Sequence, residues 1–198
     1  DLVVPAEELF PLVTVRRGEP FSRKKATNSA EQISKLLSNQ GYAFANVNSI
    51  PEIDPQTREV AITFFVDPGK RVYVRYINVS GNSNTRDEVV RRELRQMESA
   101  WFSGEQLKLS RERLQRLGYF GEVNVETPAV TGTTDQVDVN IDVEEKASGS
   151  LSAGIGYSQT QGAILSASIS QDNFLGSGKR VSAGFDTSQA NRRATLAY

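Results

Sequence analysis

The last quarter of the chain, from Ser148 to Tyr198, has the strictest alternation of apolar and small polar residues. Successive side chains of a strand point to opposite faces, so the alternation predicts strands with one apolar and one small polar face. Turns at Gln161 and Gly162 and at 176–178 separate the segments, and a fourth segment starts at Arg193. The apolar positions are Leu151, Ala153, Ile155 and Tyr157 in the first segment, Ala163, Leu165, Ala167 and Ile169 in the second, and Val181, Ala183 and Phe185 in the third.

Two kinds of sheet have this pattern. A transmembrane barrel strand alternates over about ten residues, with its apolar side toward lipid. A soluble antiparallel sheet with one solvated face alternates in the same way. The region holds only six charged residues, four of them at or near the turns, which suits the barrel, but the pattern alone leaves both interpretations open.

The first part of the chain has the periodicity of short helices and a hairpin. Pro5 is expected at the first position of a helix that Pro11 ends or kinks near Phe10. An apolar stripe predicts a helix over 22–40, which Gly41 closes. The hairpin that follows has expected strands at 44–49 and 59–66, joined by a turn at Asp54 and Pro55.

The next part predicts the same elements after an opening strand at 71–79. Thr85 followed by Glu88 has the form of a capping box, opening a helix with Val90, Leu94 and Met97 on one stripe. Ser103 followed by Gln106 is a second such box, and its helix is expected to stop at Gly118. A second hairpin is predicted from strands at 122–126 and 136–143.

These two parts are two copies of one repeat, offset by 77 residues. Such self-similarity indicates an array of small domains. Each unit is strand, helix, helix, strand, strand, and the first copy is expected to lack its opening strand. Two helices on one face of a three-stranded sheet give an α+β module. The matching pairs are Leu37 and Leu114, Gly41 and Gly118, Tyr42 and Tyr119, Val60 and Val137, Ile62 and Val139, Phe64 and Ile141, and Val66 and Val143.

Composition and charge narrow the chemistry. The net charge of −1 argues against nucleic acid, which requires a concentrated basic surface. The absence of cysteine and histidine removes thiol chemistry, the usual general base and the commonest zinc ligands. No apolar run approaches the length of a transmembrane helix. Asp1 is expected to be the start of a trimmed fragment rather than a targeting signal.

The order of elements, with a glycine and an aromatic residue after the second helix, resembles the POTRA domain. POTRA modules followed by an antiparallel barrel are characteristic of outer-membrane insertases and secretion pores. The resemblance implies a fourth module at 1–69, a fifth at 70–146, and about four strands of a transmembrane β-barrel (all-β) at 147–198. It rests on Gly41 and Tyr42, Val79 to Asn82, Arg71 to Arg75, Arg91 to Glu98, Arg113 to Phe120, Gly154 to Tyr157 and Gln171 to Gly176.

For function, the resemblance implies a non-enzymatic protein without cofactors that folds and inserts outer-membrane β-barrel proteins. Its implied location is the bacterial outer membrane, with the POTRA modules in the periplasm. Its implied partners are accessory lipoproteins, unfolded outer-membrane proteins and outer-membrane lipid. The physics of substrate handling is β-augmentation, in which an unpaired strand edge offers its backbone groups to another chain. The expected seam strand is Ser150, Leu151, Ser152, Ala153, Gly154, Ile155, Gly156 and Tyr157, in which the glycines pack weakly.

Individual residues have competing interpretations. Arg95 and Glu98 resemble the position where the family's last POTRA module docks the lipoprotein BamD, although an exposed carboxylate near a helix end is ordinarily just solvated. Arg91, Arg92 and Arg95 are candidates for an acidic partner or a lipid phosphate, or form a solvated face offset by acids. Trp101 and Phe102 are expected in the module core. Tyr157 suits either an interfacial aromatic belt or ordinary lipid-facing packing.

Two other functions remain open at the level of sequence. One is a two-partner secretion or autotransporter-assembly pore of the same superfamily. The other is a soluble periplasmic scaffold of POTRA modules whose β tail never enters lipid. The open edges expected of a partial barrel sheet require pairing or a partner in either case.

Overall fold

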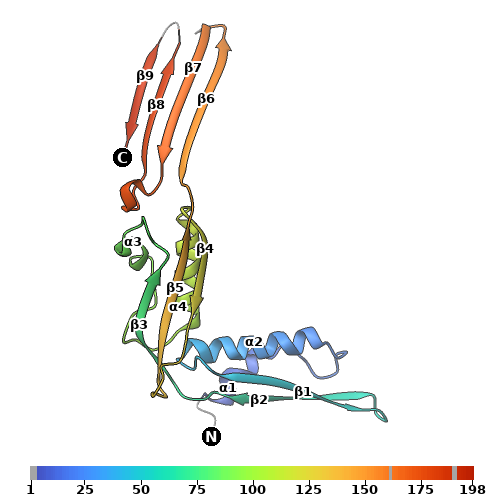
Figure 1. Ribbon diagram of the computed structural model, residues 1–198. Coiled ribbons are helices and arrows are strands. Elements are labelled where there is room, and N and C mark those ends of the chain that lie inside the picture. Colours follow the sequence, from blue (N-terminus) through green and yellow to red (C-terminus); the bar gives the residue numbers. More distant parts are fainter. Residues whose placement is uncertain (1–3, 161, 189–190) are drawn as a thin grey trace. The chain divides into compact units, whose positions relative to one another are not determined.

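The computed structural model describes residues 4–160, 162–188 and 191–198 (Figure 1). Its contacts group the chain into two compact units, and the division passes through the second repeat. The predicted turn after the first terminal strand lies partly outside the described residues, because Gln161 is not among them. The first unit contains Asp1–Ile77, Arg95–Leu109 and Glu126–Val139, and the second contains Asn78–Leu94, Ser110–Val125 and Asn140–Tyr198.

The first repeat has one long helix against a two-stranded sheet. The Ser22 side chain caps that helix by accepting a hydrogen bond from the backbone N–H of Lys25 at 3.4 Å. Pro5 lies at the cap of the short first helix rather than inside it, and a 3-10 turn takes over at Phe10, as Pro11 predicts. The elements are α1 (Ala6–Leu9), η1 (Phe10–Leu12), α2 (Arg23–Asn39), β1 (Asn46–Asp54) and β2 (Glu59–Asp67).

The core of the first repeat forms where one stripe of α2 meets the sheet. Ile33 and Leu37 are almost completely buried there, together with Val4, Leu9 and Tyr42. Strands β1 and β2 pair in an antiparallel hairpin that places Asp54 opposite Glu59, at the predicted turn. Alternate residues of β2 are partly buried, as the predicted period of two requires.

The second repeat is a three-stranded sheet in the order β3-β5-β4, with two helices. Its core is built from alternate residues of β5 and from one face of α4, which gives the α+β module that the repeat predicts. The elements are β3 (Tyr73–Ser80), α3 (Asp87–Arg91), α4 (Gly104–Arg116), β4 (Phe120–Glu126) and β5 (Gln136–Glu145). Its buried apolar residues include Val74, Val89, Val90, Leu114, Phe120, Val123, Val137, Val139, Ile141 and Val143.

Of the two predicted capping boxes in this repeat, one is wrong. Helix α3 spans only Asp87–Arg91, its N-cap is Arg86, and no side chain caps it. Thr85 is engaged elsewhere: its hydroxyl accepts from Asn173 at 2.7 Å. Met97, expected on the buried stripe of that helix, lies beyond it and is 67% exposed. The N-cap half of the second box is confirmed, because the Gln106 N–H donates to Ser103 Oγ at 3.4 Å, while the Ser103 N–H donates to Gln96 Oε1 at 2.9 Å.

The terminal region is a four-stranded antiparallel sheet in the order β6-β7-β8-β9. A short turn of 3-10 helix, η2, lies between β7 and β8 (Figure 1). Within the described residues, no helix is both long enough and apolar enough to cross a membrane. The elements are β6 (Gly149–Ser158), β7 (Gly162–Gln171), η2 (Phe174–Gly176), β8 (Val181–Thr187) and β9 (Arg192–Ala197).

Candidate functional site

One face of the terminal sheet is apolar and open. The register places Leu151 opposite Ile169 and Ile155 opposite Leu165, so the apolar positions of neighbouring strands share one face. On β6, the side chains of Leu151 and Ile155 are 80% and 89% exposed. Monomeric soluble proteins rarely expose a contiguous apolar surface of this kind, which marks contact with a membrane or a partner.

The opposite face of the same sheet carries small polar groups. The hydroxyls of Ser150 and Ser170 lie 2.7 Å apart, and those of Ser152 and Ser168 lie 2.8 Å apart. Strand β6 lies at one end of the sheet order, and among the described residues it pairs with β7 alone. Its other edge therefore presents unpaired backbone N–H and C=O groups within the part of the chain that the structure describes.

The turn between β7 and β8 packs directly on the second repeat, within one compact unit. The backbone N–H of Arg86 donates to the carbonyl of Gly176 at 3.0 Å. Gly176 has φ +70°, and a Cβ there would lie 2.0 Å from the carbonyl oxygen of Asn84. Glycine is required at this position both for the left-handed backbone and for the close approach. The contact holds the turn against the loop before α3.

Glu145, near the end of β5, organises that loop. Its carboxylate accepts from the backbone N–H of Thr85 at 2.6 Å and from the side-chain amide of Asn84 at 2.7 Å. Burial by itself would raise the pKa of Glu145, but the hydrogen bonds from Thr85 and Asn84 outweigh it and lower the pKa to about 2. The charged carboxylate thereby fixes the loop on which the β7–β8 turn rests.

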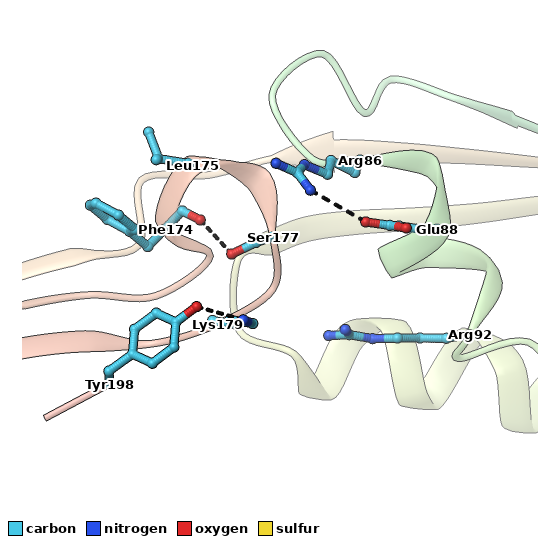
Figure 2. A pocket seen from close by; sticks show the side chains of 8 residues that line it. All are labelled: Arg86, Glu88, Arg92, Phe174, Leu175, Ser177, Lys179 and Tyr198. Carbon is cyan, nitrogen blue, oxygen red and sulfur yellow. Dashed lines mark hydrogen bonds and ion pairs between the residues drawn. The ribbon is translucent and has the colours of Figure 1, made fainter.

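A pocket of about 670 Å³ lies beside this turn. Figure 2 shows it between the turn and α3, with Arg86 and Glu88 forming an ion pair on one side and Lys179 contacting the hydroxyl of Tyr198 on the other. The lining combines three cations, one carboxylate and several apolar side chains. These are Arg86, Glu88, Arg92, Phe174, Leu175, Ser177, Lys179 and Tyr198.

The expected docking residues Arg95 and Glu98 lie in the segment between α3 and α4, not at a helix end. Glu98 Oε1 accepts from the backbone N–H of Ile77 at 2.8 Å, so this exposed carboxylate is not merely solvated. Strand β3 is irregular just before Ile77. After Val74 the next buried residue is Ile77, where a regular alternation would bury Tyr76. An extra residue of this kind is a β-bulge, which turns a backbone N–H away from the ladder.

The segment that carries Glu98 also covers the edge of β3. Ser99 N donates to the carbonyl of Val74 at 2.7 Å, and Ala100 O accepts from the Val74 N–H at 2.9 Å. The prediction that Trp101 and Phe102 both lie in the core is half wrong. Phe102 is buried, but Trp101 is 51% exposed; its ring lies under the guanidinium of Arg71, which is 4.0 Å from the ring centroid, rather than in the core.

Sequence reasoning missed the loop of Asn84 and Thr85, the pocket, and the hydrogen bond from the Ile77 N–H to Glu98. The stretch 176–178 is predicted only as a turn. Gly176 and Gly178 have positive φ, as does Asn173 at φ 55°, and the presence of these glycines and asparagine is the sequence signal that could have indicated a tight turn. No cluster of three or more metal-binding acidic side chains occurs in the part of the chain that the structure describes.

Comparison with known proteins places these features in a family. The family model described as "POTRA: Surface antigen variable number repeat" matches residues 1–69 and 72–146. This chain belongs to the POTRA family. Both α+β repeats are thus POTRA repeats, as the resemblance in the sequence implies.

Named relatives of this POTRA chain are assembly factors. It is 37% identical over 195 residues to the outer membrane protein assembly factor BamA of Neisseria meningitidis, an alignment that covers 98% of this chain and 24% of that protein. The chain therefore spans about a quarter of the length of that curated relative. It also resembles two solved POTRA-containing structures.

The first solved structure is BamA from Haemophilus ducreyi lacking POTRA domains 1–3, which is 36% identical with a TM-score of 0.87 and covers 96% of this chain and 36% of that one. The second is the POTRA3–5 fragment of Haemophilus influenzae BamA, 34% identical with a TM-score of 0.67, covering 70% of this chain and 55% of that one. The resemblance to the BamA type of POTRA protein is confirmed. The roles of Arg95, Glu98 and the seam strand stay predictions.

Proposed function

We propose that this chain is part of an outer-membrane assembly factor that folds and inserts β-barrel proteins. The observation that carries the proposal is the terminal sheet, where an exposed apolar face adjoins an open β6 edge. In lipid, apolar side chains can face outward, but backbone N–H and C=O groups must be hydrogen-bonded. Only a closed or paired sheet satisfies both requirements. The apolar face contacts lipid, and the sheet belongs to a barrel that the rest of the protein completes.

Strand β6 acts as the seam in this proposal. Its open edge pairs with the terminal strand of an unfolded substrate through backbone hydrogen bonds, which read little of the side-chain sequence. Gly154 and Gly156 weaken its packing and let the strand separate, because each lacks a side chain that would hold its neighbours. Such a mechanism requires no nucleotide and serves many substrates.

The POTRA modules lie in the periplasm in this proposal and bind accessory lipoproteins. Arg95 and Glu98 form the docking point for the lipoprotein BamD, as the resemblance of residues 91–98 implies. The hydrogen bond that the Ile77 N–H donates holds the Glu98 carboxylate in one position, which supports a preformed docking site. A fixed charge loses little side-chain entropy when a partner binds.

The test is reconstitution of the full-length protein in liposomes with an unfolded barrel substrate. Folding of the substrate, followed by its heat-modifiable migration, is expected to depend on the reconstituted protein. A Ser152→Cys variant on β6 is expected to form a disulfide with a cysteine in the substrate's terminal strand during assembly. Ser168→Cys is the matched control, because Ser168 lies directly opposite on β7, whose two edges are both paired.

Two outcomes contradict the proposal. Equal crosslinking through Ser168→Cys removes the seam role of β6. A full-length protein that stays monodisperse without detergent removes the membrane role and favours a soluble periplasmic scaffold, because an apolar face in water drives association.

A further inference from the structure

The pocket beside the β7–β8 turn carries an excess of positive charge. Arg86, Arg92 and Lys179 line it, against the one carboxylate of Glu88 (Figure 2). The ion pair between Arg86 and Glu88 spans 3.6 Å, with side chains 61% and 73% exposed. Exposed pairs at this separation are weak, so the guanidinium keeps most of its capacity to bind an anion.

The cations are held in place by the fold of the turn. A Cβ at Gly178 would lie 2.4 Å from Arg92 Nη2, so the guanidinium of Arg92 rests against the backbone of this glycine. The Lys179 ammonium lies 4.7 Å from the ring centroid of Tyr198. The carbonyl of Lys179 accepts from the Phe174 N–H at 2.8 Å, which closes the turn.

The same turn presents two apolar side chains to the outside. Leu175 is 77% exposed and Phe174 is 39% exposed. Leu175 also has φ +51° and ψ +33°, in the left-handed region, which is strained for a residue other than glycine. The strained backbone and the exposed leucine side chain each cost free energy, and strained residues of this kind cluster at functional sites.

We infer that this pocket binds the phosphate of an anionic phospholipid headgroup, with Leu175 and Phe174 contacting the adjoining acyl region. The inference rests on the proposed membrane location of the terminal sheet. Cations beside aromatic and aliphatic side chains are the composition of a membrane interface, where long basic side chains reach the headgroups. An acidic peptide would satisfy Arg86, Arg92 and Lys179, but would leave Leu175 without an apolar partner.

The position of the pocket gives the binding a consequence. The loop and turn that form it are the contact through which the terminal sheet rests on the second POTRA repeat, within one compact unit. A phosphate shared by Arg86 and Arg92 of the repeat and Lys179 of the turn bridges both partners of that contact. Bound lipid is therefore expected to stabilise the contact.

The experiment is native mass spectrometry of the full-length protein in detergent micelles, titrated with phosphatidylglycerol. Micelles make the measurement independent of bilayer insertion. The pocket variant is Arg86→Gln, Arg92→Gln and Lys179→Gln. Each basic residue near an anionic lipid contributes about fivefold in affinity, so the triple variant is expected to bind phosphatidylglycerol on the order of a hundredfold more weakly.

The control variant is Lys108→Gln, Arg111→Gln and Arg116→Gln, which removes the same charge from the same repeat outside the pocket. It is expected to retain phosphatidylglycerol affinity within a few fold. A photoactivatable phosphatidylglycerol is expected to label a peptide containing Phe174 and Leu175. Phosphatidylcholine and inorganic phosphate are the competing ligands, and both are expected to displace the lipid poorly.

Each remaining result decides the matter. Equal loss in the control variant overturns the inference, because the effect is then net charge. Displacement by inorganic phosphate at the same concentration as the lipid overturns the lipid source. Loss of an accessory protein from the pocket variant, with lipid binding intact, identifies a protein surface instead. If liposome assembly succeeds while lipid labelling at the turn fails, only this inference is wrong; labelling without assembly activity contradicts the proposed function alone.

Discussion

Replacing Glu145 with Gln is expected to loosen the contact between the β7–β8 turn and the second POTRA repeat. The native carboxylate has its pKa lowered from 4.5 to about 2, chiefly because the hydrogen bonds from Thr85 and Asn84 exceed the opposing effect of burial. A shift of that size corresponds to about 3 kcal/mol of preference for the charged form. Since the group is partly exposed to water, we take about 2 kcal/mol for its contribution.

The readout is hydrogen exchange of the amides of Asn84, Thr85 and Arg86 in the full-length protein, measured by mass spectrometry. These amides donate to Glu145 or to the turn, so they report opening of the loop itself. Loss of about 2 kcal/mol is expected to speed their exchange about 30-fold at pH 7. Glu144→Gln is the control, because Glu144 is the exposed neighbour on the opposite face of β5.

The pH dependence supplies a second check. A carboxyl whose folded pKa is lowered stabilises the fold above its unfolded pKa of 4.5 and loses that contribution as the pH falls toward about 2. Protection of the loop, corrected for intrinsic exchange rates, is therefore expected to decline below pH 4.5 in the native protein and to stay flat in Glu145→Gln. Equal exchange in both proteins at pH 7 would refute the reasoning.

Two further substitutions test the close contacts. Gly176→Ala is expected to open the same loop, by about 1–3 kcal/mol for strained backbone alone, since the new Cβ meets the carbonyl of Asn84. Hydrogen exchange measures it against Gly156→Ala, where nothing lies within 4 Å, and unchanged protection in Gly176→Ala contradicts it. Glu98→Lys and Glu98→Gln are both expected to reduce lipoprotein co-purification. Only the lysine variant also loses the acceptor for the Ile77 N–H, at about 1 kcal/mol in urea unfolding; full co-purification of Glu98→Gln would remove the docking role.

Most of the local structure could be predicted from the periodicity of apolar residues and from the residues that begin and end helices and turns. The stripe of Ile33 and Leu37 predicts α2, and the alternation from Val60 to Val66 predicts β2, because burial on one face leaves the same period in sequence and structure. The box at Thr85 failed for a physical reason. Both groups of Thr85 that a capping box would use are engaged by distant residues: the hydroxyl accepts from Asn173, 88 residues away, and the N–H donates to Glu145, which no local pattern records.

The sequence by itself determined the two repeated α+β modules, the alternating terminal strands and the family, since each depends on side-chain period or on matching residue runs. Only the tertiary structure decided which groups meet: Glu98 with the Ile77 N–H, Glu145 with the loop of Thr85, and Arg86 and Arg92 with the turn that carries Lys179. Those contacts join residues far apart in the chain. Their geometry follows from how the sheets and the turn pack. Packing between segments that are distant in the chain produces no periodic pattern in the sequence.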